Sequence, residues 1–124
     1  MRITKSLQRS LDNILWEISP LSTDSTGLPM VIYVSAIKTK EIEPRIFVRN
    51  KQYDDYHYKT KDLVLVTIKN EPEQMALVKG NKLLSSKDYD IVKRWIRLNK
   101  KTLIAYGNNE IDTSIFINLM KKSK

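Results

Sequence analysis

Apolar side chains recur at helical spacing between Ser85 and Gly107, the longest regular pattern in the chain. At about 100° per residue, they fall on one side of a helix, with Asn99 among them. Ser85 and Asp88 have the spacing of a capping box, and Gly107 can adopt the left-handed conformation that ends many helices. The pattern predicts a helix over 85–107, in which Asn99 is either hydrogen-bonded in the core or marks a gap in the packing. Its core-facing side is expected to hold Tyr89, Val92, Trp95, Ile96, Leu103 and Tyr106.

Apolar residues at three- and four-residue spacing also predict helices near both ends of the chain. The first covers residues 3–18 and ends at Ser19 and Pro20, with a polar linker after it. Trp16 points away from its apolar side, so this side chain is either covered by a loop or contacts a partner. The last helix is short and is expected to begin at an N-cap provided by Asp112 or Thr113.

Strand patterns occupy the middle of the chain. Residues 30–37 and 63–69 are rich in β-branched side chains and apolar on both faces, which indicates interior strands. Residues 45–50 alternate strictly, and a short hairpin is expected over 75–84 with its turn at Gly80 and Asn81.

These elements predict one α+β domain over residues 1–124. The expected order is an N-terminal helix, a three- to four-stranded mainly antiparallel sheet, a long helix and a short C-terminal helix. The helices are expected to pack on one face of the sheet.

The composition restricts the chemistry of the chain. It has no cysteine, which excludes disulfides, thiolate metal sites and thiol catalysis. No apolar run reaches the roughly 18 residues that span a bilayer, and the first residues lack the apolar core of a signal peptide. We therefore expect a cytoplasmic protein that needs no membrane, metal or cofactor. The net charge is +8, and most of the excess lies after residue 85, which favours encounters with nucleic acid or an acidic protein surface.

Two sets of basic residues are candidate binding sites. One is the side of the 85–107 helix opposite its apolar residues, which is either a polyanion-binding face or an ordinary solvated face. The other is the second face of the 45–50 strand, where an aromatic ring between two arginines could stack bases and contact phosphates if that face is open. The helix residues are Lys93, Arg94, Arg97, Lys100 and Lys101, and the strand residues are Arg45, Phe47 and Arg49.

The polar connection over 51–62 holds the only histidine, His57. Asp54 and Asp55 lie beside it, but this set lacks the additional ligand that usually completes a metal site. An alternative is metal-independent catalysis, in which His57 acts as a general base and Arg45, Arg49 or Lys59 stabilises a phosphoryl transition state.

From Gly27 to Thr113 the chain resembles a group of small uncharacterised bacterial proteins. The matching stretches are GLPMVIYVS at 27–35, WIRLN at 95–99 and YGNNEIDT at 106–113. Gly107 stands where the pattern has Trp, and Asn109 where it has Gly. The resemblance implies a compact α+β unit from a mobile-element or toxin–antitoxin-like context, and it implies no activity.

The sequence thus favours a non-enzymatic accessory or regulatory protein that binds nucleic acid or an acidic protein through a basic surface. One alternative is a small ribonuclease-like toxin that uses His57. Another is a structural homo-oligomer in which a second copy covers Trp16, Ile91 and Leu98.

Overall fold

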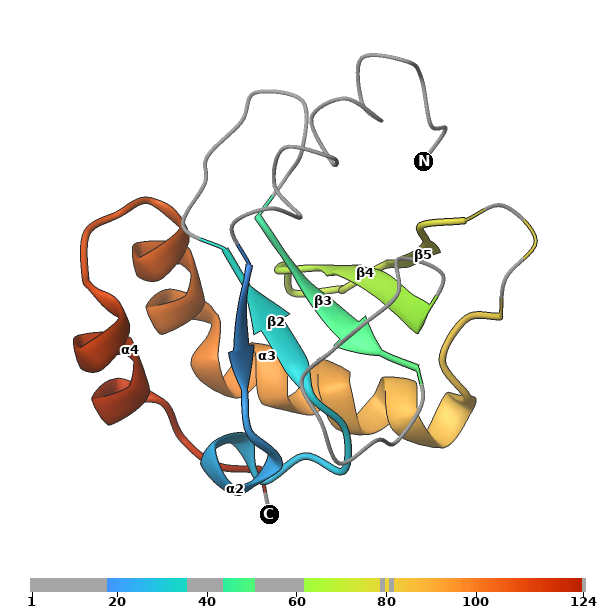
Figure 1. Cartoon of the computed structure of the whole chain (residues 1–124), viewed down its shortest axis with the longest axis horizontal. Coiled ribbons are helices and arrows are strands. Elements are labelled where there is room, and N and C mark those ends of the chain that lie inside the picture. The colour runs from blue at the N-terminus through green and yellow to red at the C-terminus, as the bar shows by residue number, and fades with distance from the viewer. Residues whose placement is uncertain (1–17, 36–43, 51–61, 79, 81, 124) are drawn as a thin grey trace.

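The computed structural model describes residues 18–35, 44–50, 62–78, 80 and 82–123. Five antiparallel strands form one sheet in which the spatial order follows the chain order. A long helix, α3, crosses one face of this sheet, and a shorter helix, α4, lies beside α3 (Figure 1). The strands are β1 (Ser19–Leu21), β2 (Ile32–Val34), β3 (Arg45–Arg49), β4 (Leu63–Thr67) and β5 (Gln74–Ala76), and the helices are α2 (Thr23–Thr26), α3 (Ser86–Gly107) and α4 (Thr113–Leu119).

The α+β class and the long helix followed by a short helix are as the sequence predicts, whereas the described residues form five strands rather than three or four. The additional strand is β1, where the sequence predicts the end of a helix and a linker. Ser19 pairs with Val34 and Leu21 with Ile32, so tertiary pairing overrides the weak strand propensity of this segment. Pro20 fits here because β1 is an edge strand. The rest of the predicted N-terminal helix, with Trp16, lies outside the described residues.

The face of the sheet toward α3 carries the main core. Alternate residues of neighbouring strands, such as Val34, Ile46 and Val66, are buried here with Trp95 and Ile96 of α3. Side chains on the opposite face form a second buried cluster: Val31, Tyr33, Phe47, Leu63, Leu65 and Leu77. Both faces of β2, β3 and β4 are therefore buried, as the sequence predicts for the strands around residues 30–37 and 63–69.

The predicted hairpin over 75–84 is wrong in its second half. Residues 74–76 pair with β4, but residues 82–84 form no strand. Leu84 instead packs in the main core, where its backbone N–H donates to Gln74 Oε1 at 2.9 Å. This segment thus leads the chain directly into α3.

Helix α3 begins and ends where its sequence predicts, but the left-handed residue at its C-terminal end is a different one. The Ser85 hydroxyl accepts a hydrogen bond from the Asp88 N–H. At the other end Gly107 remains helical, and the left-handed residue is Asn109, with φ of 60°. Asp112 then caps α4, accepting from the Ile115 N–H at 2.9 Å. One face of α4 packs inward through the buried Phe116. The centres of the Phe116 and Tyr106 rings lie 4.7 Å apart.

Asn99 is hydrogen-bonded in the core, the first of its two expected roles. Its side-chain amide donates to the Lys121 carbonyl at 2.9 Å, and its carbonyl oxygen accepts from the Lys121 N–H at 2.7 Å. Beyond Lys121, the Ser123 N–H donates to the Thr26 carbonyl at 2.7 Å. The segment after α4 is therefore bound to both α3 and α2.

Candidate binding surface on helix α3

The five cations predicted as a binding face divide into two groups according to their contacts. Lys93 is engaged within its own helix, where its Nζ lies 3.4 Å from Asp90 Oδ1 and 4.4 Å from the centre of the Tyr89 ring. Its side chain is only 25 % exposed. Contacts within α3 therefore hold the Lys93 ammonium group, which is less accessible to a binding partner.

Arg97 and Lys100 hold the connection between β4 and β5. Arg97 Nε donates to the Asn70 carbonyl at 3.0 Å, and Lys100 Nζ donates to Asn70 Oδ1 at 2.8 Å. Arg97 also lies 3.6 Å from Glu71, which is an exposed and hence weak ion pair. The Tyr89 hydroxyl donates to the Pro72 carbonyl on the same connection. These contacts make Arg97 and Lys100 structural residues that attach α3 to the edge of the sheet.

Arg94 and Lys101 differ from the other three because both are exposed and neither has a hydrogen bond or ion pair within the described residues. Lys87, which the sequence reasoning missed, lies seven residues before Arg94 and is exposed in the same way. Seven residues are almost two helical turns, so the three cations follow one line at intervals of about 10 Å. We call Lys87, Arg94 and Lys101 the basic ridge. Their regular spacing was the sequence signal that could have identified Lys87.

The expectation of an open face at Arg45, Phe47 and Arg49 is wrong. These side chains are 6 %, 1 % and 4 % exposed. β3 is the middle strand of the sheet, and Phe47 lies between its cross-strand partners Tyr33 and Leu65. Phe47 therefore has no exposed ring on which a base could stack.

Burial also changes the electrostatics of Arg45. Loss of hydration lowers the pKa of its guanidinium to about 10. The group still carries its charge near neutral pH, but as a buried side chain it presents almost no surface to a partner.

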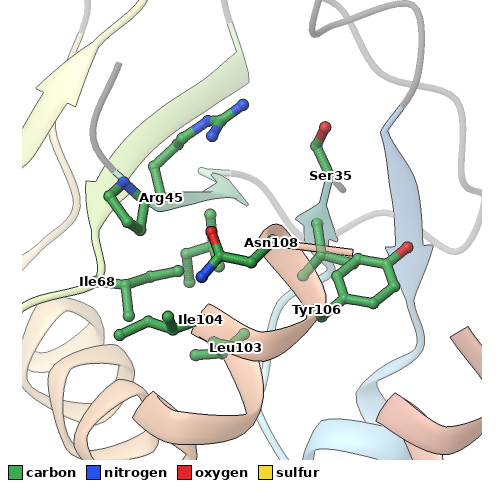
Figure 2. Close-up of a pocket in the computed structure, with 11 residues that line it drawn as sticks. Ser35, Arg45, Ile68, Leu103, Ile104, Tyr106 and Asn108 are labelled. Carbon is green, nitrogen blue, oxygen red and sulfur yellow. The ribbon is translucent and has the colours of Figure 1, made fainter. Parts of the chain in front are cut away.

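A small cavity of about 80 Å³ lies between the C-terminal end of α3 and the ends of β2, β3 and β4. Figure 2 shows Ile68, Leu103 and Ile104 along its apolar side, with the Arg45 guanidinium and the Ser35 hydroxyl directed away from them. The described lining includes no carboxylate and no imidazole. The cavity thus offers apolar contact but no acid–base pair.

The residues of the catalytic alternative are not brought together by the described structure. His57, Asp54 and Asp55 lie outside the described residues, and Arg45 and Arg49 are buried. Within the described ranges, no group of three or more histidine, aspartate or glutamate side chains is placed to hold a metal ion. Nor is any helix of the described chain long and apolar enough to cross a membrane.

Comparison with known protein families, curated proteins and solved structures finds no match to this chain. The resemblance to small bacterial proteins stays a prediction, and no activity is carried over from it.

Proposed function

We propose that the protein is a non-enzymatic accessory or regulatory protein that binds a polyanionic partner through the basic ridge of α3. The partner class is nucleic acid or an acidic protein surface. The observation that carries the proposal is the contrast on one helix between cations with structural contacts, such as Arg97 and Lys100, and cations that stay exposed at regular intervals. In keeping with the cysteine-free composition, the proposal places the protein in the cytoplasm.

The ridge suits a polyanion for two physical reasons. Its cations are exposed, so little desolvation opposes an approaching anion, and their charge adds to a net charge of +8 that attracts such partners over a distance. Neighbouring ridge cations are about 10 Å apart. This distance is close to the width of the DNA major groove, which is about 12 Å. The ridge can therefore contact separated phosphates or separated carboxylates without moving α3.

The test compares two triple variants that remove the same charge from the same helix. The ridge variant changes Lys87, Arg94 and Lys101 to Ala, and the matched control changes Lys93, Arg97 and Lys100 to Ala. Fluorescence anisotropy with labelled single-stranded and duplex oligonucleotides, and with polyglutamate, measures the affinity at several salt concentrations. Thermal unfolding of each variant is measured in parallel.

We expect the ridge variant to lose binding while its Tm stays close to wild type. For a duplex, the slope of log K against log salt should fall by about 3, since each phosphate contact contributes about 0.9. The control variant should unfold at a lower temperature, because it loses the contacts to Asn70, and should keep most of its binding below that temperature. Equal loss in both variants would show that net charge, not the ridge, determines binding, and no binding by wild type would refute the proposal.

A further inference from the structure

The basic ridge is one half of a longer pattern on the outer surface of α3. Three apolar residues, Ile91, Leu98 and Ala105, also lie seven residues apart, each four residues after a ridge cation. Together the six residues alternate at spacings of four and three, which is the spacing of the a and d positions of a coiled coil. We call Lys87, Ile91, Arg94, Leu98, Lys101 and Ala105 the α3 seam.

The apolar members of the seam have different environments. Ile91 is half-buried and packs against the main core, and Ala105 is also half-buried. Leu98 is 48 % exposed and lies between Arg94 and Lys101 along the seam. Leu98 thus exposes a large aliphatic side chain between two cations that form no ion pair within the described residues. Helix α3 has 22 residues, which is long enough for three heptads.

We propose that the α3 seam docks an acidic amphipathic helix of another protein. This inference rests on the proposed function, and it selects the acidic protein from the two partner classes named there. The docked helix would place aliphatic side chains against Ile91, Leu98 and Ala105, and glutamate or aspartate side chains beside the ridge. Helix-to-helix docking of this kind is a common mode of peptide recognition.

Charge complementarity identifies this occupant. A second copy of the chain would bring three cations against three cations, which opposes association through this face. A nucleic acid backbone would satisfy the cations, but its phosphates would leave Leu98 without an apolar contact. An acidic amphipathic helix satisfies both kinds of residue at the same spacing.

The probe is a designed helical peptide of three heptads with leucine at a positions and glutamate at d, e and g positions. Three comparators isolate its features: a scrambled peptide of the same composition, polyglutamate, and a DNA duplex. The protein variants are Leu98→Gln and the matched control Ile117→Gln. Ile117 lies on α4 and is 44 % exposed, so the two substitutions remove similar exposed aliphatic surface from different helices.

We expect the designed peptide to bind more tightly than the scrambled peptide or polyglutamate. Leu98→Gln should weaken binding of the designed peptide by about tenfold, the effect of losing the burial of one leucine. Ile117→Gln should leave that binding unchanged, and neither variant should alter binding of the duplex.

Three results would overturn the inference. One is equal affinity for the designed and scrambled peptides, and another is no effect of Leu98→Gln on the designed peptide. The third is a stable dimer of the protein alone that Leu98→Gln dissociates, measured by light scattering. Binding of the designed peptide that depends on the ridge but not on Leu98, the second of these results, would refute the seam while leaving the proposed function intact. Failure of every probe to respond to the ridge variant would refute both.

Discussion

Asn99 is a buried polar residue on the apolar side of α3, and its amide holds the chain after α4 through both the N–H and the carbonyl of Lys121. Replacing it with Ala leaves partly buried backbone groups without their partners, which costs more than the bonds themselves contribute. We expect Asn99→Ala to lower the free energy of unfolding by about 2 kcal/mol, measured by chemical denaturation.

Asn118→Ala is the control for this prediction because Asn118 is exposed on α4. It should change the free energy of unfolding by less than about 0.5 kcal/mol. Similar values for the two variants would mean that the Asn99 amide does not hold the C-terminal segment.

Gly27 and Gly80 share a left-handed backbone but differ in their surroundings. Their φ values are 73° and 86°. A Cβ at Gly27 would lie 2.5 Å from the Ser123 carbonyl oxygen, whereas a Cβ at Gly80 would meet no atom within 4 Å in the described part of the chain beyond its sequence neighbours. Gly80→Ala therefore carries backbone strain alone, while Gly27→Ala also displaces the segment that pairs with Thr26.

We expect Gly80→Ala to lower the free energy of unfolding by about 1 kcal/mol and Gly27→Ala to lower it by more. Exchange of the Ser123 amide hydrogen should also accelerate in Gly27→Ala only, because its bond to the Thr26 carbonyl is lost. If both variants lost the same stability and hydrogen exchange at the Ser123 amide were unchanged, the predicted clash between a Cβ at position 27 and the Ser123 carbonyl oxygen would be contradicted.

Single residues also show where sequence reasoning reaches its limit. The pattern places Asn99 on the core side of α3, but its partner Lys121 is 22 residues away and no local signal connects them. In the sequence, Arg45 and Arg49 indicate an outward strand face because charged residues are usually exposed. They are buried because side chains from several elements pack over this face of the sheet, which is a property of the whole fold.

Among the elements, α3 is predictable because its cap, its period and its end are all local signals. β1 is not predictable, since three residues with a proline form a strand only when β2 is available to pair. The division of cations along α3 depends similarly on a distant element. Arg97 and Lys100 become structural only because the β4–β5 connection lies beside them.

The β4–β5 connection contains its own ion pair, between Lys69 Nζ and Glu73 Oε1 at 3.0 Å. The hydrogen bond and charge of Lys69 hold the pKa of Glu73 below its ordinary value of 4.5. The charged carboxylate therefore favours the folded state above pH 4.5, and this contribution is lost as the pH falls through the lower folded pKa.

We expect Lys69→Met to raise the pKa of Glu73 toward 4.5, measured by NMR titration of its side-chain carboxyl signal. The contribution is small because both groups are exposed. An unchanged midpoint in Lys69→Met would show that another group lowers the pKa.

At the scale of the whole molecule, α3 packs through the main core on one face of the sheet and turns its opposite side outward (Figure 1). The charged residues at 45–49 are buried in the sheet, and the β4–β5 connection occupies one side of α3. The α3 seam remains as the exposed basic surface of that helix.

The most direct test maps a bound probe on the molecule by NMR. Isotope-labelled protein is titrated with the designed acidic peptide and, separately, with the DNA duplex, and backbone amide shifts are followed. We predict that the largest changes fall on α3 around Arg94, Leu98 and Lys101, with little change at Asn70 or Ser35. Changes that centre on Ser35, Asn108 and the cavity between them, with α3 around Leu98 unaffected, would contradict the account.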